Sequence, residues 1–205
     1  MSTQNLVAFA VTCLLIEITP GPNMAYLAVL SAVSGRRAGL AATVGIALGL
    51  LAVGLASAFG LASLISTSPL AYEALRWGGV VYLLWLSWDG WRDAETSAAK
   101  ADAPAGDAGY FARGLVTNLL NPKAAVFYVA VLLSFVTAGI AVLQQTVLLS
   151  AIYVAIATAI HSGIVVLAGA ARPFLEDPSR SRVLRRTLSL VLAGIAVWFA
   201  YATAR

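Results

Sequence analysis

Cysteine, histidine and charge are scarce in this chain. Cys13 is its one cysteine and His161 its one histidine, which excludes an intrachain disulfide, a Cys-x-x-Cys redox pair and a His/Cys metal cluster. Charged residues make up 11% of the 205 residues, while 60% are hydrophobic. A soluble domain has about 25% charged residues, so the composition predicts an integral membrane protein.

Several other signals are missing as well. The residues before the first apolar run contain no lysine or arginine, so we expect that run to be a retained span and not a cleaved signal peptide. Ser162 stands beside His161, but neighbouring residues of a helix do not face each other, and no nucleophile–base pair is evident. We therefore expect no enzyme, no cofactor, no bound metal and no nucleic-acid partner.

Six apolar runs are long enough to cross a bilayer, which takes about 20 residues. They cover residues 5–34, 38–66, 70–92, 110–138, 142–171 and 184–204. Residues 94–109 hold no large apolar side chain and form the one real linker. The expected fold is therefore all-α, with six transmembrane helices in a single membrane domain. A first half (1–93) and a second half (110–205) contribute three helices each, joined by a cytoplasmic linker (94–109).

Lysine and arginine are distributed unevenly between the connections. The connections after the first, third and fifth runs hold ten of the 13 basic residues, whereas the N-terminal segment and the connections after the second and fourth runs hold none. Because basic loops stay in the cytoplasm, this bias predicts that both termini are periplasmic. Three spans per half then place the two halves in inverted orientations.

Proline interrupts the opening run of each half. The first interruption is Thr19-Pro20-Gly21-Pro22-Asn23 and the second is Asn118-Leu119-Leu120-Asn121-Pro122-Lys123. We predict a helix break at each, with Thr19 and Asn121 as N-caps before a proline at the first helical position. The restarted helices would present free N–H groups, which can hold a carboxylate. Paired broken helices in inverted repeats are typical of a secondary transporter.

Three ionisable residues fall inside the apolar runs near these breaks. Glu17 precedes the first break and Lys123 follows the second, so the two could form an ion pair. A charge at this depth is costly, which favours a gate that substrate opens, although a fixed neutralising pair is the alternative. Glu17 is also a candidate for proton coupling. His161 could relay protons, or be a neutral imidazole bonded to a carbonyl.

Four motifs resemble the LysE/RhtB family of bacterial amino-acid exporters. They are TPGPN at 19–23, GRRAGLAATVGIALG at 35–49, LRWGGVVYLLWL at 75–86 and RGLVTNLLNPKAAVFYVAVL at 113–132. The resemblance implies six membrane helices, the bacterial inner membrane, and export of amino acids or close derivatives driven by the proton gradient. Carried over, the family motif falls on Thr19, Pro20, Gly21, Pro22, Asn23, Asn118, Asn121, Pro122 and Lys123. The chain departs from the family at Leu133-Ser134-Phe135, where Pro-Gln-Phe is common, and at Glu17, where an uncharged residue is usual.

The number of deep charges suggests the type of substrate. Glu17 is the one deep carboxylate, so we expect a neutral amino acid similar to threonine, homoserine or leucine, and not lysine or arginine. A cation or metal-ion exporter of the same fold and a passive small-solute channel are the alternatives. Gly45 and Gly49 form a GxxxG face for close helix packing, within one chain or in a homodimer. Glu73–Arg76 and Asp89–Arg92 have the spacing of ion pairs along one helix.

Overall fold

The described part of the chain is helical and contains no strand. The computed structural model describes residues 1–18, 21–59, 68–96, 106–137, 141–170 and 178–202. In chain order its elements are α1 (Thr3–Ile18), α2 (Pro22–Ser34), α3 (Arg36–Ala58), α5 (Pro69–Thr96), α6 (Asp107–Leu119), α7 (Pro122–Val126), η1 (Phe127–Val131), η2 (Leu132–Phe135), α8 (Val142–Gly169) and α9 (Pro178–Ala202). This confirms the all-helical class predicted from composition.

Membrane-spanning character is clearest in three places. Helices α3 and α8 are each long and apolar enough to cross a bilayer, and α1 with α2, bent by 58° at their break, would form a third span. The other predicted runs coincide with α5, with the broken segment from α6 to η2, and with α9. The arrangement of six spans in two inverted halves stays a prediction.

The first break is capped by glycine. Gly21 has an extended backbone (φ −158°, ψ 176°) and precedes Pro22, which occupies the first turn of α2. The predicted N-cap, Thr19, is therefore wrong by two residues, because a residue before proline avoids the helical region and α2 cannot begin ahead of Pro22. Thr19 and Pro20 themselves lie outside the described residues.

The second break has the predicted cap. Asn121 is the N-cap of α7, and its side-chain oxygen accepts a hydrogen bond from the backbone N–H of Lys123 at 3.0 Å. Pro122 follows at the first helical position. Beyond α7 the chain winds as a π-helix (η1) and then as a 3₁₀ turn (η2), so the segment at Leu133-Ser134-Phe135 is not regular α-helix. Such irregular turns are frequent at functional sites.

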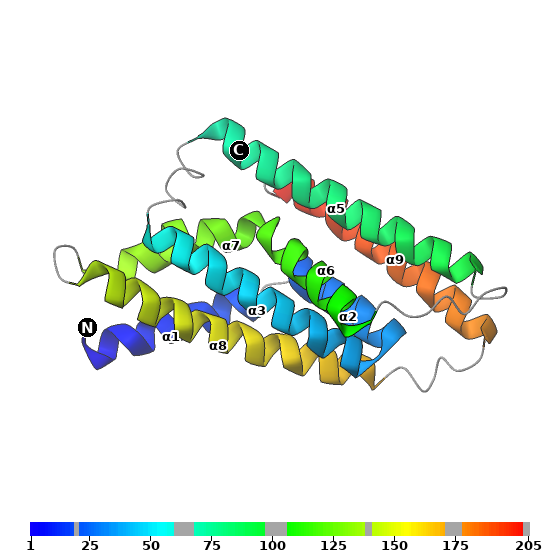
Figure 1. The fold of residues 1–205 in the computed structure, drawn as a ribbon, viewed down its shortest axis with the longest axis horizontal. Coiled ribbons are helices and arrows are strands. Elements are labelled where there is room, and N and C mark those ends of the chain that lie inside the picture. The colour runs from blue at the N-terminus through cyan, green and yellow to red at the C-terminus, as the bar shows by residue number, and fades with distance from the viewer. Residues whose placement is uncertain (19–20, 60–67, 97–105, 138–140, 171–177, 203–205) are drawn as a thin grey trace.

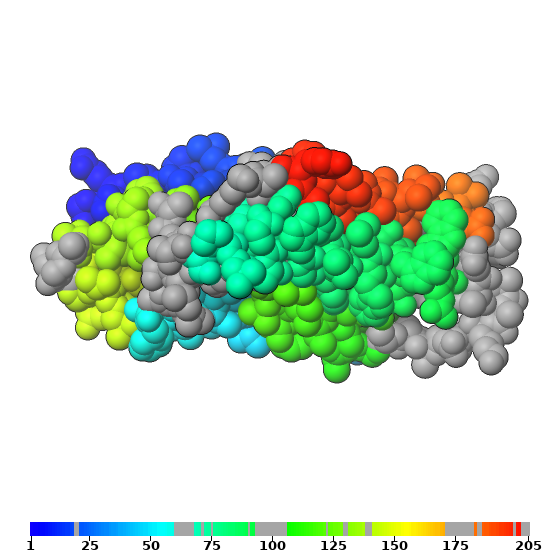
Figure 2. Space-filling view, turned by 90° about the horizontal axis from the view of Figure 1, so that it is seen from above, coloured from blue at the N-terminus to red at the C-terminus, as the bar shows by residue number. Residues whose placement is uncertain are grey.

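Helix α3 lies at the centre of the packing. It packs against α6 and α8, while α5 packs along α9 and α9 also contacts α2 (Figure 1). Figure 2 shows the pair α5 and α9 side by side along one face of an elongated molecule. The two helix breaks lie among the remaining helices, beside α3 and α8.

Glycine lets α3 and α6 approach closely. A Cβ atom added to Gly45 would collide with the backbone carbonyl of Phe111, and one added to Gly114 would collide with that of Ala42. Gly49 faces the side chain of Asn118. The predicted Gly45–Gly49 face is thus covered by a helix of the same chain, as small-residue interfaces in membranes usually are.

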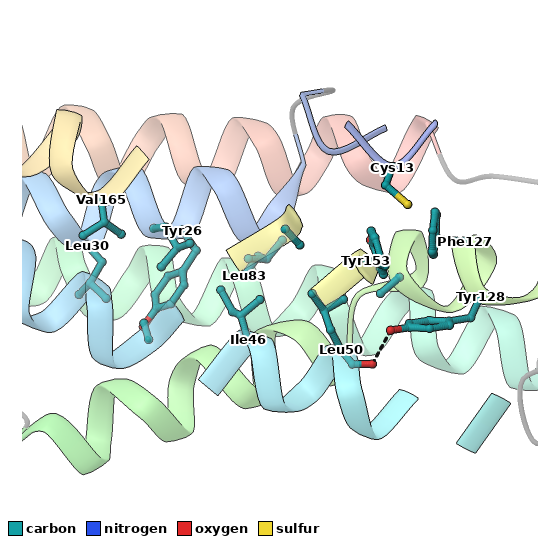
Figure 3. Close-up of a cluster of buried hydrophobic side chains, with 14 of the residues drawn as sticks. Cys13, Tyr26, Leu30, Ile46, Leu50, Leu83, Phe127, Tyr128, Tyr153 and Val165 are labelled. Carbon is teal, nitrogen blue, oxygen red and sulfur yellow. Dashed lines mark hydrogen bonds between the residues drawn. The ribbon is translucent and has the colours of Figure 1, made fainter. Parts of the chain in front are cut away.

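Aromatic side chains fill the core next to the breaks (Figure 3). Phe127 stacks on Tyr153 with ring centroids 3.7 Å apart, and Tyr128 and Phe9 pack edge-on or tilted against the same group. The hydroxyl of Tyr128 donates to the carbonyl of Leu50 at 2.7 Å. This cluster ties the π-helical segment to α3 and α8, which fixes one wall of the pocket.

Large apolar side chains cover much of the outer surface. Those more than half exposed include Leu15, Ile18, Val44, Val81, Trp88, Leu167, Leu190 and Tyr201. A soluble monomer rarely exposes apolar patches on this scale, so these faces fit a lipid surrounding.

Candidate functional site

The two helix breaks meet in space. The side-chain amide of Asn23, in the first turn of α2, donates to the side-chain oxygen of Asn118 near the end of α6 at 2.9 Å. A Cβ atom added to Gly21 would lie 3.5 Å from Cδ and 3.6 Å from Nζ of Lys123. The lysine side chain therefore crosses directly over the glycine cap, and the start of α2 faces the start of α7.

Lys123 joins the second break to the end of α1. Its ammonium donates to the backbone carbonyl of Ile16 at 2.9 Å. Ile16 belongs to the last turn of α1, whose final carbonyls have no partner within the helix. A cation is favourable there because the C-terminal end of a helix carries partial negative charge. Lys123 thus holds in place the helix end that carries Glu17.

Glu17 is buried and is held from α8. One carboxylate oxygen accepts a hydrogen bond from the hydroxyl of Tyr153 at 2.7 Å, and the other lies 3.4 Å from Nε2 of His161. The side chains of Glu17 and His161 are 6% and 1% exposed. The His161 contact has the length of an ion pair and not of a hydrogen bond, and its Nδ1 finds no hydrogen-bond partner among the described residues. The imidazole of His161, which can gain or lose a proton, therefore lies beside the buried carboxylate of Glu17.

These residues enclose a pocket between α1, α2, α3, α7 and α8. The space between their side chains, including its opening to the outside, is about 260 Å³. Its lining consists of Glu17, Gly21, Asn23, Met24, Leu50, Asn121, Lys123, Ala124, Tyr153 and His161. One carboxylate and one ammonium thus share a small, partly apolar space.

Most residues singled out from the sequence come together here. Glu17, Gly21, Asn23, Asn121, Lys123 and His161 line the pocket. Asn118 lies behind Asn23 as its hydrogen-bond partner, and Pro22 is buried in the first turn of α2. Pro122 sets the start of α7. Thr19 and Pro20 are not among the described residues.

Tyr153 is the main pocket residue that the sequence reasoning missed. It is 1% exposed and provides the shortest described contact to Glu17. Tyr153, Ala157, His161 and Val165 are all buried and recur every four residues along α8. Helical spacing from His161 was therefore a usable signal, because residues four apart share one face of a helix.

Ion pairs outside the pocket were anticipated only in part. Arg76 pairs with Glu73 at 2.6 Å, which confirms one predicted pair, and Arg76 also donates to the carbonyl of Ala200 in α9. Asp89 forms an ion pair with Arg113 of α6 at 3.0 Å. Spacing along α5 cannot reveal a partner on another helix.

An all-helical membrane chain with a polar pocket at two facing helix breaks has the architecture of a membrane transporter. Comparison with known proteins agrees: the model of the LysE type translocator family matches residues 14–203. The chain belongs to this family.

Two similar proteins have been described by their activity. The homoserine/homoserine lactone efflux protein of Salmonella typhimurium is 28% identical over 180 residues, covering 87% of each chain. The protein of the same description from Salmonella typhi is also 28% identical over 180 residues. An uncharacterized membrane protein of Pseudomonas aeruginosa is 29% identical over 164 residues, or 74% of this chain and 73% of that protein. No solved structure matches the chain.

Proposed function

We propose that this protein is a secondary active exporter of neutral amino acids across the bacterial inner membrane, driven by the proton gradient. One observation carries the proposal. The ammonium of Lys123 and the carboxylate of Glu17 line the same pocket, at the point where α2 and α7 begin. These are the complements of the two charges of a zwitterionic amino acid.

Each end of the substrate has a partner in the pocket. The carboxylate would bind Lys123 and the free N–H groups at the start of α2, where helix geometry favours an anion. The ammonium would bind Glu17 and the side-chain oxygen of Asn121. In binding Lys123, the substrate replaces the carbonyl of Ile16, so its arrival would release the end of α1.

The remaining lining favours a small uncharged side chain. Met24, Leu50 and Ala124 are apolar, and the hydroxyl of Tyr153 is nearby. Glu17 is the one carboxylate of the lining, so a second cationic group would have no counter-charge. The relatives described as homoserine/homoserine lactone efflux proteins make L-homoserine the first substrate to test.

Glu17 would also couple export to protons. Its carboxylate lies between Tyr153 and His161, both of which can carry a proton. A proton and the substrate ammonium would compete for the same carboxylate. Binding of one therefore favours release of the other, which is the exchange that a proton-driven exporter needs.

Counterflow in proteoliposomes tests this function. We expect saturable exchange of L-homoserine, L-threonine or L-leucine, and stimulation by an imposed proton gradient that a protonophore abolishes. Glu17→Gln should remove the stimulation. Glu73→Gln is the matched control, because Glu73 pairs with Arg76 outside the pocket, and it should behave like the parent.

Other results would support a different function. Saturable efflux of L-lysine without exchange of the three neutral amino acids would contradict the proposed substrate. Flux that does not saturate and ignores the protonophore would indicate a passive channel. Transport of a labelled divalent cation in place of amino acids would indicate a cation or metal-ion exporter.

A further inference from the structure

A second polar cluster lies outside the pocket, where the α5–α9 pair meets α6. Asp89 of α5 and Arg113 of α6 form an ion pair of 3.0 Å, with side chains 30% and 33% exposed. The pair joins elements that otherwise make few contacts with each other. Both charges are partly exposed at the molecular surface.

Aromatic side chains hold Arg113 in position. Its guanidinium lies over the ring of Trp85, 5.6 Å from the centroid, and Trp85 stacks on Tyr82 at 5.6 Å. The hydroxyl of Tyr82 donates to the backbone carbonyl of Arg113 at 3.4 Å. A guanidinium stacked in this way keeps its donors in a fixed plane, which suits recognition of a carboxylate.

Tyr26 adds a buried hydroxyl that lacks a partner. The residue is 4% exposed, and its hydroxyl makes no hydrogen bond to any residue that the structure describes. It lies within electrostatic range of the charges of Arg113 and Asp89, which places it beside the same cluster. A buried hydroxyl without a partner is unfavourable, and a polar ligand at this position would satisfy it.

The cluster lies between the pocket and the arginine-rich ends of the helices. Tyr26 follows Asn23 by three residues along α2, and Arg113 precedes Asn118 by five along α6, which corresponds to about 4.5 and 7.5 Å of helix. Both displacements run toward the end of the molecule where α3 begins with Arg36 and Arg37. In Figure 3, Tyr26 lies between Leu30 on one side and the pocket residues Leu50 and Tyr153 on the other.

We propose that Asp89, Arg113 and Tyr26 form a second binding site for the zwitterionic amino acid, occupied before the pocket is reached. The inference rests on the proposed function. The substrate carboxylate binds Arg113 and its ammonium binds Asp89, while the Tyr26 hydroxyl donates to the carboxylate. Between substrates the two charges neutralise each other. When the substrate moves one to two turns inward, it meets the same pair of charges in Lys123 and Glu17.

The test measures KM for L-homoserine separately from each face of oriented proteoliposomes. Arg113→Gln and Asp89→Asn should each raise KM about tenfold or more from the arginine-rich face, because each removes a hydrogen bond to a charged group. Tyr26→Phe should also raise it about tenfold or more, because the hydroxyl donates to the charged carboxylate of the substrate. The KM from the opposite face should stay at the parental value.

A matched control separates substrate binding from a structural tie. Arg37 and Asp107 form an ion pair of 2.8 Å between α3 and α6 at the same end of the molecule, with side chains 87% and 52% exposed. Arg37→Gln and Asp107→Asn should leave both KM values unchanged. Unchanged KM in the cluster variants, an equal rise from both faces, or the same rise in the controls would overturn the inference while leaving the pocket intact. Absence of amino-acid exchange by the parent would overturn the proposed function as well.

Discussion

The role of Lys123 can be tested by removing its charge and keeping its shape. Lys123→Met retains an unbranched apolar side chain of similar length, which can still pass over Gly21. The substitution deletes the ammonium that donates to the carbonyl of Ile16 and that we propose binds the substrate carboxylate. Any loss can then be assigned to the charged group and not to a cavity.

The size of the effect follows from the contact that is lost. A hydrogen bond to a charged group contributes about 1.5–3 kcal/mol, and each 1.4 kcal/mol is about tenfold in affinity. KM for L-homoserine should therefore rise about 10- to 150-fold in Lys123→Met. Lys100→Met, which changes the chain's other lysine, is the control and should keep the parental KM.

A decarboxylated substrate sharpens the assay. Removal of the carboxylate from L-homoserine gives 3-aminopropan-1-ol, which keeps the ammonium and the hydroxyl. In proteoliposome counterflow the parent should prefer L-homoserine, and Lys123→Met should lose this preference while its inhibition by 3-aminopropan-1-ol stays unchanged. An equal loss for both compounds would mean that the substitution damages the fold, and no loss for either would refute the role of Lys123.

Three further predictions concern the packing and hydrogen bonds around the pocket. Gly45→Ala should lower the free energy of unfolding by about 1–3 kcal/mol, because its Cβ meets the α6 backbone. Thermal unfolding in detergent checks this, with Gly163→Ala as the control because its Cβ meets nothing within 4 Å. Equal stability of the two variants would contradict the prediction. Asn23→Ala and Asn118→Ala should show a coupling energy of about 0.5–3 kcal/mol in a double-mutant cycle of thermal stability, since their side chains bond directly at 2.9 Å; strict additivity would argue against that contact. Tyr153→Phe keeps the ring stack but loses the hydrogen bond to Glu17, so proton-stimulated exchange should fall about tenfold or more. A parental response to the proton gradient would show that Tyr153 does not take part in proton coupling.

Local chemistry made the helix breaks predictable from the sequence. Asn121 before Pro122 combines a capping side chain with a residue that lacks a backbone N–H, and α7 begins there. The other break was placed correctly only within two residues, because the first of the two prolines that flank Gly21 was taken as the start of the helix, whereas α2 begins at the second. Glu17, Lys123 and His161 stood out because ionisable residues are rare inside apolar runs.

Contacts between helices could not be read from the sequence. The Asp89–Arg113 pair depends on how α5 meets α6. The Tyr153–Glu17 hydrogen bond likewise depends on how α8 packs beside α1. Spacing along one helix identifies which residues share a face, but it does not say which face of another helix lies opposite.

The central claim is that the helix breaks hold a zwitterion with its carboxylate on Lys123. The chain has two lysines, so a Lys100→Arg variant labelled with ¹⁵N-lysine carries a single labelled ammonium, that of Lys123. Dipolar recoupling in the solid state can measure its distance to the carboxylate of ¹³C-labelled L-homoserine in lipid bilayers. We predict about 3–4 Å, as direct contact between an ammonium and a carboxylate requires. Bound L-homoserine that shows no dipolar coupling to this nitrogen would contradict the claim.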